Sequence, residues 1–348
     1  MGIATNTATP GPGPAGPTAG GRGGASAAEA FVVTRRGTPI WVWGGFAVLV
    51  LSLWGLNQVE ILINNYVLHV LTIVGINVIL VAGLNIINGY LGEFAIGHAG
   101  FMAVGAYVAS VATVLFQINF FVALALGMAG AALVGYLVAI PAFKTFGDYL
   151  AIVTLGFNMI IVNVIQNIDA IGGPRGLGGM PRATNFLIVA AAAALTVVVI
   201  RNLVYSNWGR VWVAIRENDI AAEMMGVNVM KYKVVGFTVA ALFAGLAGGL
   251  LAHLMQYINP SSFTYIKTTD ILLMLYLGGM GSMSGSIVGA TALTVALELL
   301  RPLGVWRMVV NPLILIMVML TRPVGIMGNR EFRFIPQKEE IRFHDEQR

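Results

Sequence analysis

The chain has 348 residues, of which 57% are hydrophobic and 10% are charged, and it contains 43 glycines and no cysteine. Soluble domains carry about 25% charged residues, so this composition excludes an ordinary soluble globular protein. The lack of cysteine excludes thiolate metal sites, thiol nucleophiles and disulfides. The net charge is +5. In a membrane protein the basic residues gather on the cytoplasmic side of the bilayer, so this excess does not by itself indicate nucleic-acid binding. The sequence predicts an all-α polytopic membrane protein with about 8–10 transmembrane helices.

Shifts in composition divide the chain into three parts. Residues 1–36 are rich in glycine, proline and alanine and show no apolar periodicity. They cannot bury enough surface to offset their ordering entropy, so we expect a disordered cytoplasmic tail. They also lack the basic start and apolar core of a signal peptide. Residues 37–323 hold the apolar runs and form the predicted transmembrane domain, and residues 324–348 form a charged cytoplasmic tail.

The apolar runs of the central part predict membrane spans. The glycine-rich stretches near His98 and Gly281 are candidates for re-entrant or broken helices, which are tolerated where protein or water covers the backbone. About ten crossings place both termini on one side, and because most basic residues fall on that side, both termini are predicted to be cytoplasmic. In chain order the runs cover residues 40–56, 61–88, 98–117, 120–142, 149–168, 185–205, 229–257, 270–277, 287–300 and 308–320.

A polar stretch of helical character, residues 209–226, lies between the sixth and seventh apolar runs. It is too short and too polar to span a bilayer, and Trp212 in its first turn suits the membrane surface. Gly226 supplies a C-terminal stop. The spacing fits a solvated connecting helix equally well. The apolar side holds Val211, Ile215, Ala222 and Met225, and the charged side holds Arg216, Asp219 and Glu223.

No catalytic, nucleotide-binding or metal site stands out in the sequence. There is no Gly-x-x-x-x-Gly-Lys-Ser/Thr segment, so we do not expect this chain to hydrolyse ATP by itself. The histidines are scattered without the spacing of metal ligands, and no long polar insertion offers room for an enzymatic domain. We therefore expect no metal, no cofactor bound by this chain and no enzymatic activity.

Polar residues in or beside the apolar runs are candidates for a substrate pathway, because such groups are costly inside a membrane. Asparagines there also form hydrogen bonds between helices, so both roles stay open. Glycines are candidates for close helix packing. The candidate pathway residues are Asn77, Asn85, Asn88, Glu93, His98 and Asn158. The candidate packing residues are Gly245, Gly249, Gly278, Gly279 and Gly281.

Several separate segments, in the right order, resemble those of branched-chain amino acid ABC transporter permeases of the LivM type. The run Arg-Glu-Asn-Asp-Ile-Ala-Ala-Glu-Met-Met-Gly at 216–226 resembles the coupling segment of that family. The likeness covers most of the chain, and the order of the segments makes it specific. The other matching segments are 85–101, 149–157, 243–249, Pro260 with Ser262 and Phe263, and 277–282 with Gly285.

The resemblance implies the transmembrane permease subunit of an ABC importer for branched-chain or other aliphatic amino acids, located in the plasma (inner) membrane. It implies a LivH-like sister permease, two ABC ATPase subunits that use the ATP, and a periplasmic substrate-binding protein as partners. It also implies that residues 209–226 form a cytoplasmic coupling helix that fits a groove on an ATPase subunit. The implied coupling residues are Trp212, Ile215, Arg216, Glu217, Asp219, Ala222, Glu223 and Gly226.

The chain departs from the family pattern at several positions. Residues 158–162 lack the Glu and Arg that commonly follow Phe157, and Arg175 stands where Asn is usual. Glu93 stands in place of a common Gln, and Ala95 in place of a common Ser. If these residues line the substrate pathway, the transported substrate would not be leucine, isoleucine or valine. A urea or short-chain amide permease of the same family is therefore an alternative.

A different class of protein, an ion-coupled secondary transporter, would transport without ATPase partners and would need carboxylates near the membrane midplane. Glu93, Asp270 and Glu298 lie mostly near the ends of apolar runs, which fits that class poorly. An integral membrane enzyme is contradicted by the lack of clustered catalytic residues.

Overall fold

The computed structural model describes residues 65–145, 149–301, 313, 316–317 and 325–327. The predicted spans 40–56 and 308–320 and the predicted tails 1–36 and 324–348 lie outside these residues, apart from the few positions just given. Within the described residues the only strands are the antiparallel pair β1 (Leu177–Gly178) and β2 (Tyr257–Ile258).

Helices account for most of the described chain. Helix α2 continues without interruption into a π-helical turn, and short 3-10 turns occur in the connections. The α-helices are α2 (Asn65–Asn85), α3 (His98–Val114), α4 (Phe120–Ala142), α5 (Tyr149–Gln166), α6 (Phe186–Val204), α7 (Asn207–Glu217), α8 (Asp219–Met224), α9 (Val229–Met255), α10 (Tyr265–Gly278) and α11 (Met283–Leu299). The π-helical turn is Ile86–Tyr90, and the 3-10 turns are Asp169–Ile171, Gly173–Arg175 and Pro260–Phe263.

Five segments of the described chain are long and apolar enough to cross a membrane by length and composition. Helices α3 and α11 are shorter apolar helices, and α10 has 14 residues. These observations confirm the prediction of an all-α polytopic membrane protein. The five segments are Asn65–Tyr90, Phe120–Ala142, Tyr149–Gln166, Phe186–Val204 and Val229–Met255.

The start of α10 differs from the prediction. The helix begins at Tyr265, before the predicted run 270–277, so Asp270 lies inside it and not near its end. Polar residues interrupt the apolar run there without ending the helix, because the protein supplies partners for them. Thr268 is fully buried, and its Oγ1 accepts a hydrogen bond of 3.2 Å from the backbone N–H of Ala99.

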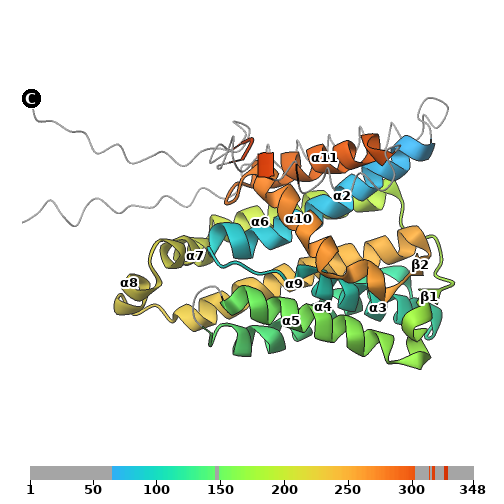
Figure 1. The fold of residues 1–348 in the computed structure, drawn as a ribbon, viewed down its shortest axis with the longest axis horizontal. Helices are drawn as coiled ribbons and strands as arrows, with labels where there is room; N and C mark the ends of the chain where they lie inside the picture. The colour runs from blue at the N-terminus through green and yellow to red at the C-terminus, as the bar shows by residue number, and fades with distance from the viewer. Residues whose placement is uncertain (1–64, 146–148, 302–312, 314–315, 318–324, 328–348) are drawn as a thin grey trace, which may run out of the picture. The chain divides into compact units, whose positions relative to one another are not determined.

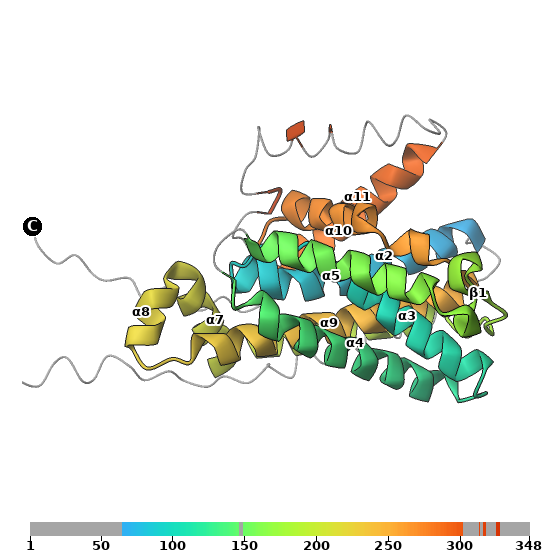
Figure 2. The same ribbon diagram turned by 60° about the horizontal axis from the view of Figure 1, so that its bottom comes forward.

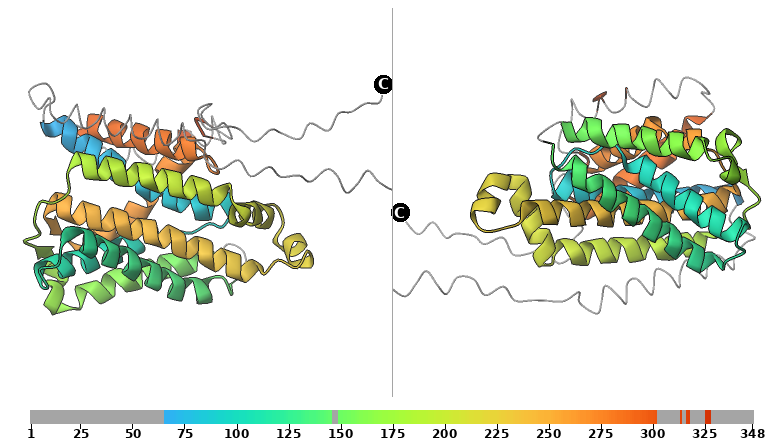
Figure 3. Two further views of the ribbon diagram at one scale, coloured as in Figure 1. Left: turned by 180° about the vertical axis from the view of Figure 1, so that it is seen from behind. Right: turned by 90° about the horizontal axis from the view of Figure 1, so that it is seen from below.

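Helices α2 and α9 are the central helices of the described part. In the apolar 18-residue stretch of each segment, 78% of the stretch in α2 and 72% of that in α9 is buried, whereas the buried share is 33% in α4 and in α5. Seen from behind, α9 runs between α3 and α4 on one side and α2 and α6 on the other (Figure 3). Helices α10 and α11 form a hairpin packed against α2, as Figure 2 shows from a second angle. The short helices α7 and α8 lie at one end and the β1–β2 pair at the opposite end (Figure 1).

Glycines bring α3 and α4 against α9. A Cβ added at Gly105 of α3 would lie 2.2 Å from the Cα of Gly245, and one at Gly248 would lie 2.0 Å from the Met102 carbonyl oxygen. A Cβ at Gly249 would lie 2.7 Å from Cδ2 of Leu124 in α4. Such distances are far below normal carbon contacts, so the helices touch backbone to backbone.

The remaining packing glycines belong to the α10–α11 hairpin. A Cβ at Gly278 would lie 2.0 Å from the carbonyl oxygen of Gly285 in α11. Gly279 and Gly281 form the turn and have φ values of +115° and +77°, which favour glycine. This turn lets two short helices meet at a sharp angle inside the protein.

The close contact at Gly248 predicts that Gly248→Ala lowers the melting temperature of the detergent-solubilised protein. The new methyl group has no room beside the Met102 carbonyl, and overpacking of this kind costs about 1–3 kcal/mol. The matched control is Gly156→Ala in α5, where no atom lies within 4 Å of an added Cβ. Alanine favours a helix over glycine by about 1 kcal/mol, so this variant should match or exceed the parent. Equal melting temperatures for both variants would contradict the packing described.

Candidate functional site

The polar stretch 209–226 forms two short helices, α7 and α8, and not the single helix that was predicted. Asn218 separates them because its backbone is extended, with φ −164° and ψ 109°. Its side chain accepts a hydrogen bond of 2.9 Å from the N–H of Ala221 and so begins α8. Gly226, with φ +82°, ends α8, and hydrogen bonds from Gly226 to Glu223 and from Val227 to Ala222 complete a Schellman motif.

The inner side of α7 is attached to α9. Trp212 was predicted to lie at the membrane surface, but it is fully buried within the chain. Its indole Nε1 donates a hydrogen bond of 3.0 Å to the carbonyl of Tyr232, and the absence of a side chain at Gly236 leaves room for the ring. Ile215 and Ala222 are buried as well. These residues therefore hold the segment to the rest of the protein and are not free to contact a partner.

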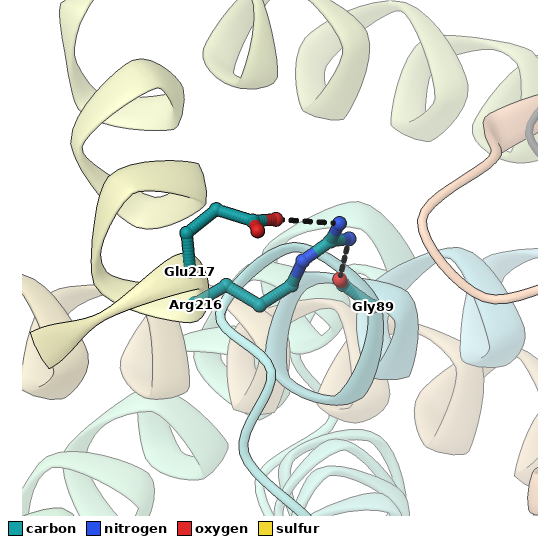
Figure 4. A network of polar contacts seen from close by, with 3 residues as sticks. All are labelled: Gly89, Arg216 and Glu217. Atoms are coloured by element: carbon teal, nitrogen blue, oxygen red, sulfur yellow. Dashed lines mark hydrogen bonds and ion pairs between the residues drawn. The ribbon is translucent and has the colours of Figure 1, made fainter.

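Charged groups tie the same segment to the chain that enters α3. Arg216 donates a hydrogen bond of 2.9 Å from Nη1 to the carbonyl of Gly89 and pairs with Glu217 at 3.1 Å, as Figure 4 shows. Lys233, near the start of α9, pairs with Glu93 at 2.5 Å and with Asp219 at 3.7 Å.

A cavity of about 390 Å³ opens at the α7–α8 junction. Both ion-pair groups border it, so its wall carries charges of both signs. Its lining residues are Leu91, Gly92, Glu93, Ile215, Arg216, Glu217, Asn218, Asp219, Ile220 and Lys233.

The outer side of α8 is apolar and exposed. Ile220 is 69% exposed, and Met224 and Met225 are each 84% exposed. Met225 was predicted to lie on the same apolar side as Ile215 and Ala222, which is wrong, because Ile215 and Ala222 are buried, whereas Met225 follows the last residue of α8 and is exposed. Glu223 is exposed beside these residues. We call Ile220, Glu223, Met224 and Met225 the α8 face.

Two of the predicted pathway asparagines join α2 to the α10–α11 hairpin. Asn77 donates a hydrogen bond of 2.9 Å to the Thr294 hydroxyl. Asn85 donates to the Ser286 hydroxyl at 2.9 Å and accepts a hydrogen bond of 2.9 Å from the N–H of Gly281. Both side chains are buried, so their observed role is to link helices.

Three other predicted residues, Asn88, His98 and Asn158, are buried without a side-chain hydrogen bond in the described part of the chain. The backbone of Leu80 lies near the His98 ring, but neither ring nitrogen makes a hydrogen bond among the described residues. His98 is the first residue of α3, at the start of the predicted run 98–117. The amide of Asn158 lies against Gly100, two residues after His98 in α3. Buried polar groups without partners are costly, so these residues stay candidates for the predicted pathway.

Glu93 lies apart from these three residues, in the ion pair with Lys233 beside α7–α8. The structure therefore divides the predicted pathway residues between helix contacts, a buried polar group and the α7–α8 junction. The sequence analysis did not single out Lys233 as a site residue, and the one signal for it was a basic residue at the start of a long apolar run. Among the described residues, no three His, Cys, Asp or Glu side chains gather as metal ligands do.

Comparisons with known proteins show which family this chain resembles. A family model described as "Branched-chain amino acid transport system / permease component" matches residues 66–321. The high-affinity branched-chain amino acid transport system permease protein LivM of Escherichia coli is 30% identical over 76% of this chain and 71% of its own length. The LivM protein of Salmonella typhimurium is 31% identical over 74% of this chain and 68% of its own.

A second type of permease is also similar. The LivH protein of Escherichia coli is 32% identical over 36% of this chain and 42% of its own length. No solved structure was found to match. The family match covers the α2–α11 region in which the α7–α8 junction and the buried polar residues lie. The chain therefore belongs to the family of permease components of branched-chain amino acid transport systems.

Proposed function

We propose that this chain is the LivM-type subunit of an ABC importer that moves branched-chain or other aliphatic amino acids across the plasma (inner) membrane. The family match and the names of the relatives support this cargo. The observation that carries the mechanism is the α7–α8 segment, which lies at one end of the membrane helices and is tied to three of them. Residues 37–323 would act as one permease domain between the two tails.

The segment fits the role of a coupling element for an ATPase subunit. Its inner side is fixed by Trp212 and Arg216, whereas the α8 face is free and apolar at Ile220, Met224 and Met225. A short helix with an exposed apolar face suits a groove on another protein. The chain has no nucleotide-binding segment of its own, so the ATP would be bound and hydrolysed by two partner ATPase subunits.

The partners and orientation follow from the same role. The α7–α8 end would face the cytoplasm together with both termini, because ATP is available there. Similarity to both LivM and LivH proteins supports pairing with a related sister permease. A periplasmic substrate-binding protein would deliver cargo at the β1–β2 end. Alternating access at the interface between the two permeases would then move the substrate.

The proposed function predicts ATP-dependent uptake by proteoliposomes that contain the copurified complex and its binding protein. The panel is labelled leucine, valine, alanine and urea, with and without ATP. We expect leucine or valine to enter only when ATP, the ATPase subunits and the binding protein are all present. Preferred uptake of urea would change the proposed substrate and would still agree with an ATP-driven importer. Uptake by the lone chain driven by an ion gradient would overturn the proposal.

The α8 face predicts that Met224→Asp weakens binding of the ATPase subunits. A carboxylate in an apolar contact loses its hydration, so the yield of copurified ATPase should fall by at least about tenfold, which corresponds to ~1.4 kcal/mol. Met255→Asp is the matched control, because Met255 is also exposed but lies at the far end of α9. The ATPase yield relative to the permease measures the effect. The same loss in both variants would argue against docking through α8.

A further inference from the structure

Arg216 contacts two segments that are distant in sequence. Its Nη1 donates to the carbonyl of Gly89 in the π-helical turn after α2. A Cβ added at Gly281, in the turn between α10 and α11, would lie 3.1 Å from the same Nη1. The stem of the side chain passes over Gly92, where a Cβ would lie 2.4 Å from Cγ of Arg216. One guanidinium thus sits where α7, the end of α2 and the α10–α11 turn meet (Figure 4).

The hydrogen bond from Arg216 gives a partner to a carbonyl at the end of a helix. Carbonyl groups in the last turn of a helix have no partner within the helix. At this end, the carbonyls of Ile86 and Ile87 accept hydrogen bonds from Leu91 and Glu93, and the carbonyl of Gly89 accepts one from Arg216. A positive charge also interacts favourably with the negative end of the helix dipole. Arg216 therefore caps the α2 helix from a different element of the chain.

The same position is tied to the α10–α11 hairpin through Asn85. Its Oδ1 accepts a hydrogen bond of 2.9 Å from the N–H of Gly281, and its Nδ2 donates to the carbonyl of Ser282 at 3.0 Å. A Cβ at Gly89 would lie 2.5 Å from the nitrogen of Gly281, so the two segments are in close contact. A displacement of Arg216 must therefore displace the end of α2 together with the hairpin turn, or break the hydrogen bond from Arg216 to Gly89.

We propose that Arg216 is the positioning residue that transmits movement of α7–α8 to the end of α2 and to the α10–α11 hairpin. Arg216 is partly exposed at the cavity beside α7–α8, and its guanidinium is bound to the Gly89 carbonyl, so the role proposed here is positioning and not contact with the ATPase. The inference rests on the proposed function, in which α7–α8 receives the movement from an ATPase. A stiff, hydrogen-bonded contact passes a rigid-body movement on, whereas a loose one absorbs it.

A distance measurement tests the mechanical connection without transport. The chain has no cysteine, so spin labels can be placed by Ala221→Cys on α8, outside the α8 face, and by Met280→Cys in the hairpin turn, both of which are exposed. The purified complex in lipid nanodiscs is measured by pulsed electron resonance. With Arg216 present we expect a narrow distance distribution, and Arg216→Gln should broaden it. The matched control is Arg210→Gln, because Arg210 lies on the same helix and its guanidinium donates a hydrogen bond to the Asn207 side chain of that helix. An Arg216→Gln distribution as narrow as that of Arg210→Gln would overturn the proposal.

A transport measurement tests the consequence. We expect Arg216→Gln to keep its bound ATPase subunits and ATP hydrolysis but to move at least about tenfold less substrate per ATP. Arg216→Lys keeps the positive charge and can still donate a hydrogen bond, so it should recover part of the ratio of substrate moved to ATP hydrolysed. If Arg216→Gln fails to fold, Arg216→Lys takes its place in the comparison. Arg210→Gln should match the parent. An unchanged ratio in Arg216→Gln would overturn the proposal. If the parent complex itself shows no ATP-dependent uptake, the proposed function fails, and the distance measurement still decides whether Arg216 ties α8 to the hairpin.

Discussion

The ends of helices that stop inside this protein need partners from elsewhere in the chain, because no water reaches them in a membrane interior. Helix α2 ends in a π-helical turn in which the Gly89 carbonyl accepts a hydrogen bond from Arg216. The extended segment that follows donates from Ile96 to the Thr154 hydroxyl of α5, and the first turn of α3 donates from Ala99 to the Thr268 hydroxyl of α10. Interrupted helices are therefore possible here only because α5, α7 and α10 complete their hydrogen bonds.

This requirement explains why glycine is so common near the interruptions. A hydroxyl or guanidinium can reach a backbone group only if the backbone approaches closely. A Cβ at Gly97 would lie 2.6 Å from the carbonyl of Thr154, so a side chain there would push α5 away from the start of α3. The same is true of Gly89 beside Gly281. The glycines that bring α3 and α4 against α9 serve packing, whereas those at the interruptions serve hydrogen bonding.

Much of the fold was predictable, because a membrane forces a strong hydropathy pattern on the chain. The apolar run 120–142 coincides with α4, and the runs that became α5, α6 and α9 were each predicted to within a few residues. Contacts between distant segments were not predictable. The spacing of Asn77 and Asn85 placed them on one face of a helix, but their partners Thr294 and Ser286 belong to the other end of the sequence. The burial of Trp212 likewise depends on the lack of a side chain at Gly236 of α9.

The break at Asn218 shows why periodicity alone misjudged the α7–α8 segment. A continuous helix would place Ile215, Ala222 and Met225 on one side, and a single surface would then have to bind both the permease and its partner. The extended residue at Asn218 separates the two helices, so that Ile215 of α7 and Ala222 of α8 are both buried while Met224 and Met225 at the end of α8 are exposed. An element that passes movement between two proteins needs a separate surface for each. In the proposed role the two short helices provide this, because Trp212 and Arg216 attach the segment to the rest of the permease and the α8 face is exposed.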